Sequence, residues 1–144
     1  MHSHTRLKPS LLTLAGRLSG LAYSLVSYVF FLLVFIYLMG FIATIGVPKG
    51  IDTGISALSW PWAIAMDVLL ITLFAVQHSG MARNRFKTWW LRYVPAPIER
   101  ATYVLFTSLV LALMYWLWQP VSITVWDIQS PLATLLLTGA YWLG

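Results

Sequence analysis

The sequence contains no cysteine and very few charged residues, and both absences exclude whole classes of protein. Without cysteine, the 144 residues can form no disulfide, zinc–thiolate site, iron–sulfur cluster or cysteine nucleophile. Only 9% of the residues are charged and 60% are apolar, whereas a soluble domain carries about a quarter charged residues. The chain therefore has too little polar surface to cover a soluble globule of its size, and we expect lipid to be its solvent.

Long apolar runs predict an all-α, multi-span transmembrane bundle formed by a single domain. Residues 18–48 hold no formal charge, and about 20 helical residues suffice to cross a hydrocarbon core of roughly 30 Å. A second run follows Ser59, a helix-capping residue type, and Gly80 offers it a C-terminal stop. A third run has Glu99 in its first turn, where the helix dipole favours an acidic residue. The predicted spans of the domain, residues 1–144, are about 21–47, 60–78, 97–118 and 131–144.

The fourth run is too short to cross the membrane. Residues 131–144 amount to 14 residues, which make ~21 Å of helix against roughly 30 Å of hydrocarbon. A helix that ended there would leave its last carbonyls and a carboxylate unpaired in lipid. We therefore expect three full spans plus a truncated fourth, in a chain that is the N-terminal portion of a longer protein.

Basic residues alternate between the segments that flank the spans. Lys and Arg number three before the first span, one between the first and second, five between the second and third, and none after the third. The positive-inside rule then predicts a multi-pass protein with a cytoplasmic N-terminus and a cytoplasmic loop from His78 to Arg100. We expect the membrane to be a bacterial inner membrane. Tryptophan favours span ends, and the predicted ends lie near Trp60, Trp62, Trp89, Trp90, Trp116, Trp118 and Trp126.

Two ionisable side chains of the second run are candidates for chemistry. Asp67 is the only acidic residue well inside a predicted span, so it is either a proton site or a structural carboxylate that bonds a neighbouring helix or water. His78 lies 11 residues later on the same helical face, ~16 Å further along the axis. A histidine at this cytoplasmic end can transfer protons near neutral pH. Alternatively, it has no chemical role and is simply stabilised there by the helix dipole and the membrane interface.

A basic loop follows His78 and offers a site for an anion. It either seats an anionic cofactor or thiolate, or only sets topology and contacts anionic lipid head groups. Glu99 and Arg100 are expected to pair or to cap the third span, as structural or proton-site residues like Asp67. The sequence has no phosphate-binding loop after a strand and no metal-ligand cluster. The loop interleaves four basic residues and two tryptophans: Arg83, Arg85, Lys87, Trp89, Trp90 and Arg92.

Residues 74–109, with the segments at 118–120 and 125–127, resemble the membrane methanethiol S-methyltransferases of the isoprenylcysteine carboxyl methyltransferase-like group. The resemblance implies transfer of a methyl group from S-adenosylmethionine to methanethiol, which yields dimethyl sulfide and S-adenosylhomocysteine. It also implies that the thiolate is favoured either by His78 as the catalytic base or by the nearby arginines as stabilising cations, and that Arg83 and Arg85 bind the cofactor. The implied partners are the lipid bilayer and a small thiol, with no nucleic acid. The most telling segments are Gln77-His78-Ser79, Met81-Ala82-Arg83, Pro97-Ile98-Glu99-Arg100 and Tyr103-Val104-Leu105.

In this group, the cofactor pocket is built mainly by a later section with an Arg-His-Pro segment, which does not occur in this sequence. We therefore expect the 144 residues to be inactive by themselves. Two other functions stay open. One is a small non-enzymatic membrane protein, such as an assembly subunit or a transporter fragment that uses Asp67, although no paired broken helices or internal symmetry are visible. The other is a different isoprenylcysteine methyltransferase-like or nitrite-reductase-associated membrane protein.

Overall fold

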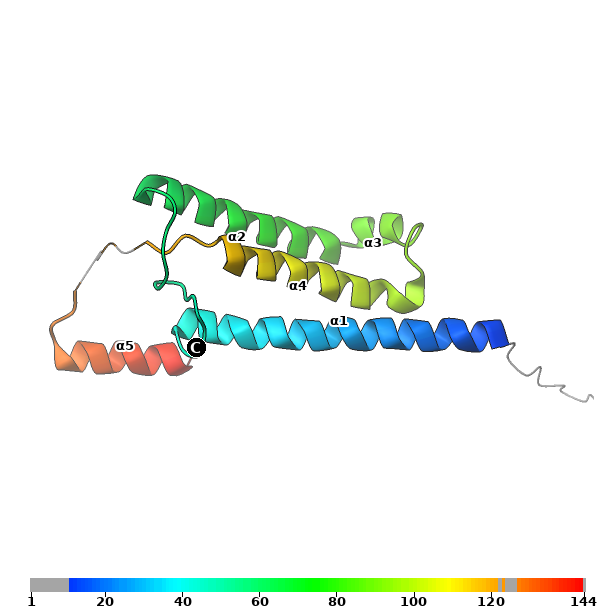
Figure 1. The fold of residues 1–144 in the computed structure, drawn as a ribbon, viewed down its shortest axis with the longest axis horizontal. Coiled ribbons are helices and arrows are strands. Elements are labelled where there is room, and N and C mark those ends of the chain that lie inside the picture. Colours follow the sequence, from blue (N-terminus) through cyan, green and yellow to red (C-terminus); the bar gives the residue numbers. More distant parts are fainter. Residues whose placement is uncertain (1–10, 122, 124–126, 144) are drawn as a thin grey trace, which may run out of the picture.

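The computed structural model describes residues 11–121, 123 and 127–143, and all regular structure in these residues is helical (Figure 1). Three stretches are long and apolar enough to cross a membrane, at Thr13–Ala43, Trp60–Ala82 and Ala96–Leu117, and Pro131–Tyr141 is a shorter apolar helix. The predicted all-α, multi-span fold is confirmed, and the chain is an integral membrane protein. The elements are α1 (Leu11–Ala43), α2 (Trp60–Ala82), α3 (Asn84–Trp90), the 3-10 turn η1 (Ala96–Ile98), α4 (Glu99–Leu117) and α5 (Pro131–Leu143).

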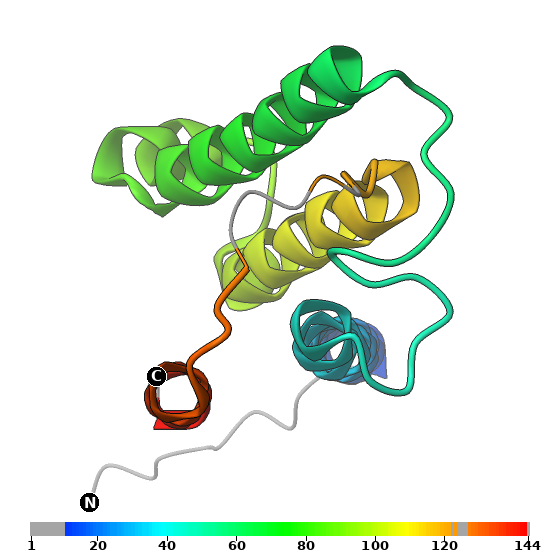
Figure 2. The same cartoon turned by 90° about the vertical axis from the view of Figure 1, so that its left-hand side faces the viewer.

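Helix α4 lies at the centre of the bundle. Figure 2 shows α4 between α2 on one side and α1 on the other. Both flanking helices pack against α4, whereas within the described residues α1 and α2 do not pack against each other and α5 packs against no other helix. The flanking helices therefore leave a groove between them, with α4 as its floor. The buried apolar core lies on both sides of α4 and consists of Val34, Phe41, Leu70, Leu111, Met114 and Tyr115.

Small buried residues bring α1 and α4 close together. Ser27 of α1 and Ser108 of α4 are 1% and 0% exposed, and each hydroxyl donates to a carbonyl one turn earlier in its own helix, at 2.8 Å. The Tyr23 hydroxyl adds a bond between the helices, because it donates to Thr102 Oγ1 at 3.0 Å. Small side chains at a helix interface let the backbones approach, as is common in membrane bundles.

Helix α1 differs from the span predicted at 21–47, because it begins ten residues earlier and ends four residues earlier. Hydropathy locates the hydrocarbon-crossing part of a helix, whereas the helix itself continues beyond the lipid. The end at Ala43 has a local cause: Thr44 adopts a positive φ of 56°, and the Ile45 N–H donates to the Gly40 carbonyl at 2.9 Å. This is the hydrogen bond of a Schellman C-cap. A Cβ on Gly40 would lie 2.8 Å from the Ile45 carbonyl oxygen, so the cap needs glycine there.

Helix α2 begins where the sequence predicts and ends later. Ser59 occupies the N-cap position, but it caps through its carbonyl, which accepts the Trp62 and Ala63 N–H groups, and not through its side chain. The predicted stop at Gly80 is wrong: Gly80 is helical, and α2 continues to Ala82, where Arg83 turns the chain into an extended conformation. The third and fourth predicted spans, 97–118 and 131–144, match η1 with α4 and α5 to within one residue at each end.

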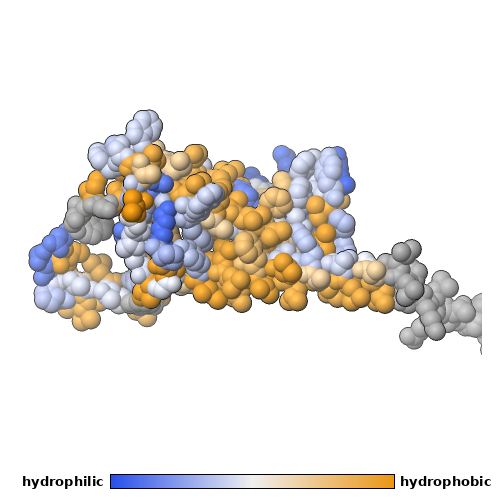
Figure 3. Space-filling model, in the orientation of Figure 1, coloured by the Kyte–Doolittle hydropathy of each residue, from blue (hydrophilic) through white to orange (hydrophobic). Residues whose placement is uncertain are grey.

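The surface of the bundle has the polarity of a membrane protein. Figure 3 shows apolar residues across the middle of the helices, with hydrophilic residues gathered toward the two ends. Large apolar side chains that face outward are numerous on α1, where Leu21 and Leu25 are 68% and 67% exposed. Such exposure costs little in lipid and much in water. Three residues used for the topology prediction, Arg6, Lys8 and Trp126, lie outside the described residues.

Candidate functional site

His78 and Tyr103 form a hydrogen-bonded pair between α2 and α4. The Tyr103 hydroxyl lies 2.9 Å from His78 Nδ1 and 3.3 Å from Nε2. The imidazole also stacks on Phe74, one turn earlier in α2, at a ring distance of 5.4 Å. A phenol can donate to an unprotonated ring nitrogen or accept from a protonated one, so Tyr103 fixes the ring orientation in either state. The histidine itself is exposed and remains reachable for a ligand.

An apolar groove of about 400 Å³ leads to His78. Its floor is α4, and its two walls come from α1 and α2, in agreement with the absence of packing between those two helices in the described chain. His78 and Thr107 are the only polar side chains in its lining. The groove therefore suits a small apolar ligand whose one reactive group meets the imidazole. The lining consists of Phe31, Phe35, Leu38, Ile71, Phe74, His78, Thr107, Leu111 and Met114.

A second hollow, of about 240 Å³, shares Tyr103 with the pair and is charged. Lys87, Glu99 and Arg100 line it, together with the phenol of Tyr28. Within the described residues these charges form no ion pair with each other, so the first alternative for Glu99 and Arg100 is not seen, whereas Glu99 does lie in the first turn of α4, as the capping alternative requires. Two cations and one carboxylate around a small space fit a ligand that carries both an anionic and a cationic group.

Two buried polar atoms at the same end of the bundle have no hydrogen-bond partner among the described residues, namely Gln77 Oε1 and Trp90 Nε1. Gln77 precedes His78, and its amide nitrogen lies 3.5 Å from Thr107 Oγ1 of the groove. The Trp90 ring packs on Phe106 of α4, with 6.1 Å between ring centres. Buried polar groups without partners are rare in folded proteins. Their presence at this end of the bundle supports the view that it contacts a further group.

Asp67 lies two turns into α2, in the half of the helix away from His78, and anchors the segment that follows α4. Its side chain is 7% exposed, and Oδ1 accepts the Gln119 backbone N–H at 2.8 Å. Gln119 also ties the loop before α2, because its Oε1 accepts the Ala57 N–H at 3.0 Å. Lys49 Nζ donates to the Trp116 carbonyl at 3.0 Å. Burial lowers the pKa of Lys49, and the charge of Asp67 partly opposes this shift. These bonds favour the structural alternative for Asp67.

Comparison with known proteins identifies close relatives. The chain is 56% identical over 130 residues to a methanethiol S-methyltransferase of a Pseudomonas strain, which covers 90% of the chain and 50% of the relative. It is 57% identical over 146 aligned residues to that of Pseudomonas deceptionensis, covering 100% of the chain and 55% of the relative. Methanethiol S-methyltransferase 2 of Bradyrhizobium diazoefficiens is 46% identical over 129 residues, 90% of the chain and 49% of the relative.

The chain is homologous to the methanethiol S-methyltransferases. The resemblance predicted from residues 74–109 is thereby confirmed. The chain spans about half the length of the curated methanethiol S-methyltransferases that it matches. No family model and no solved structure matches the chain.

The resemblance to the methanethiol S-methyltransferases singles out several residues. Some of them line the apolar groove or the charged hollow, and others line neither. His78 ends the apolar groove, and Glu99 and Arg100 line the charged hollow. Arg83 and Arg85 are exposed and line neither space, so their role stays a prediction. Tyr103 was not among the predicted site residues. It lies in the second turn of α4, and the sequence marks it only as part of the segment Tyr103-Val104-Leu105 that carries the resemblance, not as the partner of His78.

Proposed function

We propose that the full-length protein transfers a methyl group from S-adenosylmethionine to methanethiol, with dimethyl sulfide and S-adenosylhomocysteine as products. The observation that carries this proposal is the 56–57% identity to proteins named methanethiol S-methyltransferase. The methyl donor supplies an electrophilic sulfonium methyl group. A bond forms between the thiol sulfur and this methyl carbon. The bond between the methyl carbon and the sulfonium sulfur breaks, its electron pair stays on that sulfur, and the thiol proton goes to a base.

His78 is the proposed base. A thiolate is the reactive form of a thiol, so a group that removes the thiol proton raises the rate. Tyr103, whose hydroxyl lies 2.9 Å from Nδ1 and 3.3 Å from Nε2, holds the exposed imidazole in place at the groove. The apolar groove is the proposed place for the methyl group of methanethiol. Ile71, Phe74 and Leu111 give that methyl group an apolar surround next to the imidazole.

The charged hollow beside Tyr103 is the proposed contact of this half of the protein with the methyl donor. S-adenosylmethionine ends in an amino acid with a carboxylate and an ammonium group, and Lys87, Arg100 and Glu99 offer the opposite charges. Arg83 and Arg85, exposed where α2 gives way to α3, are proposed as further cationic contacts. The remainder of the donor site belongs to the other half of the full-length protein, so residues 1–144 alone are expected to be inactive.

The single transmembrane domain of residues 1–144 is proposed to lie with its N-terminus in the cytoplasm. This orientation places the charged hollow and His78 on the side from which a water-soluble methyl donor arrives. The five basic residues between Ala82 and Ala101 support it, as does the single lysine between α1 and α2. The expected location is a bacterial inner membrane.

Replacement of His78 in the full-length protein tests the proposal. We expect His78→Ala to lower the rate of dimethyl sulfide formation by about 10²–10⁴-fold, the usual contribution of a general base, with unchanged protein in the membrane. Tyr103→Phe should have a smaller effect, because the imidazole stays and loses only its hydrogen bond. Headspace gas chromatography measures the product.

Thr72→Ala is the matched control, because Thr72 is exposed on the same helix and bonds only the Val68 carbonyl of its own helix, at 2.7 Å. It should leave the rate unchanged. If His78→Ala also leaves the rate unchanged, the histidine is an interfacial residue and the assignment of the base is wrong. If the wild-type full-length protein forms no dimethyl sulfide, the proposed reaction itself is wrong.

A further inference from the structure

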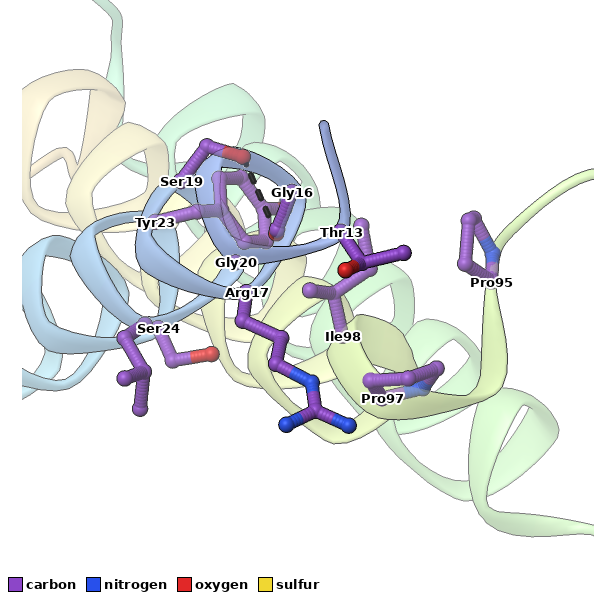
Figure 4. Close-up of a pocket in the computed structure, with 11 residues that line it drawn as sticks. Thr13, Gly16, Arg17, Ser19, Gly20, Tyr23, Ser24, Pro95, Pro97 and Ile98 are labelled. Atoms are coloured by element: carbon purple, nitrogen blue, oxygen red, sulfur yellow. Dashed lines mark hydrogen bonds between the residues drawn. The ribbon is translucent and has the colours of Figure 1, made fainter. Parts of the chain in front are cut away.

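A third hollow, the largest of those described, lies outside the site discussed so far, where the first turns of α1 meet η1. It has a volume of about 960 Å³ and is lined over three turns of α1, from Thr13 to Ser24, with Pro95, Pro97 and Ile98 opposite. Figure 4 shows these side chains around the start of α1. The space beside Gly16 is open, because a Cβ added there would meet no atom within 4 Å. We call this space the Arg17 groove.

Arg17 is the only charged residue in the lining of this groove. In Figure 4 its guanidinium extends away from Ser19, on the opposite side of α1. Within the described residues it forms no ion pair, and no carboxylate lines the groove. The rest of the lining is apolar or carries only small hydroxyl groups and the Tyr23 phenol. The groove thus combines one uncompensated cation with an apolar trough.

The position of the groove along α1 fits the boundary between lipid head groups and hydrocarbon. Arg17 immediately precedes the 31-residue uncharged run, and the helix extends beyond the length that the hydrocarbon core needs. Beyond Arg17, exposed leucines continue along α1 into the apolar belt, with Leu18, Leu21 and Leu25 at 57%, 68% and 67%. A molecule with an anionic head at Arg17 would therefore have an apolar path for its tail.

We propose that the Arg17 groove binds an anionic phospholipid, with the phosphate on the Arg17 guanidinium and one acyl chain in the trough beside Gly16 and Gly20. Charge complementarity identifies this occupant. A guanidinium pairs well with phosphate oxygens, and anionic lipids are the negative partners available on the cytoplasmic leaflet. The Gly16-x-x-x-Gly20 spacing, which often marks a helix-packing face, serves here to make room for the chain.

Native mass spectrometry of the protein, purified in mild detergent from its own membranes, tests this lipid site. The probes are phosphatidylglycerol and phosphatidylcholine of the same chain length. We expect retention of phosphatidylglycerol in preference to phosphatidylcholine. Arg17→Gln should weaken phosphatidylglycerol binding about fivefold, the worth of one basic residue near a lipid surface. Gly16→Leu should weaken both lipids, since its side chain starts in open space, where a Cβ meets no atom within 4 Å, and would occupy the trough without removing the charge of Arg17.

Arg92→Gln is the matched control, because Arg92 is an exposed basic residue of the same predicted membrane side and lies outside the groove. The Arg92→Gln protein should bind phosphatidylglycerol as tightly as the wild type does. Equal retention of the two lipids by the wild type, or equal loss in the Arg17 and Arg92 variants, would overturn the proposal. A lipid-free dimer that Gly16→Leu dissociates would also overturn it, and would assign the groove to a second copy of the chain.

Discussion

At the scale of single residues, Asp67 offers a test of structural anchoring. Its carboxylate accepts the Gln119 N–H at 2.8 Å in a place where only 7% of the side chain is exposed. Asp67→Ala leaves this N–H without an acceptor, which costs about 1–3 kcal/mol for a buried group. We therefore expect a lower melting temperature in detergent for Asp67→Ala. Asp67→Asn keeps an oxygen acceptor and should lose less.

Asp52→Ala serves as the control for this comparison, since Asp52 is exposed in the loop between α1 and α2. Its melting temperature should equal that of the wild type. If the Asp67→Ala protein has the melting temperature of the wild type but loses activity, the carboxylate takes part in the chemistry, as in the proton-site alternative.

The two candidate residues of α2 could be found from the sequence, because a charge in an apolar run and a histidine at its end are visible without a structure. Their partners could not. Gln119 lies 52 residues from Asp67, and Tyr103 lies 25 residues from His78. Pairs of this kind depend on which helices pack and in which rotation, and hydropathy carries no information on either. The same limit applies to Lys87, which the sequence shows only as one basic residue of the loop and the structure places in the lining of the charged hollow.

At the scale of the elements, the apolar groove follows from the way α1 and α2 flank α4. Ile71 lines this groove and is still 49% exposed, so a larger side chain can be placed there without overpacking the core. We expect Ile71→Trp in the full-length protein to raise the KM for methanethiol more than it lowers kcat, because it narrows the proposed thiol site and leaves His78 in place.

Val68→Trp provides the comparison, because Val68 is 55% exposed on the same helix and does not line the groove. Its kinetic constants should stay close to those of the wild type. Identical KM values for the two tryptophan variants would show that the thiol binds elsewhere.

Helix positions were predicted well, and helix ends less well. An apolar run locates the part of a helix that must lie in lipid, so three crossing helices and a shorter fourth were correctly placed. The ends depend on local backbone geometry. Thr44 stops α1 by adopting a positive φ, which a threonine rarely does, and Gly80 remains helical although glycine commonly ends helices. Neither outcome follows from residue preferences alone.

At the scale of the whole molecule, the absence of cysteine makes topology directly measurable. A single cysteine at Arg85→Cys, in the exposed part of α3, should resist an impermeant maleimide in intact cells and react after the membrane is opened. Ile55→Cys, in the loop between α1 and α2 where Ile55 is 92% exposed, should react in intact cells. The reverse pattern would place the basic loop outside and contradict the proposed orientation.

The account depends most on the claim that the full-length protein methylates methanethiol at the His78 end of the groove. Membrane vesicles that contain the full-length protein can be given methanethiol and S-adenosylmethionine with a deuterated methyl group, and the headspace followed by gas chromatography with mass detection. The account predicts deuterated dimethyl sulfide from the wild type and the Thr72→Ala control, and about 10²–10⁴-fold less from His78→Ala. Wild-type vesicles that form no more deuterated product than vesicles lacking the protein would contradict it.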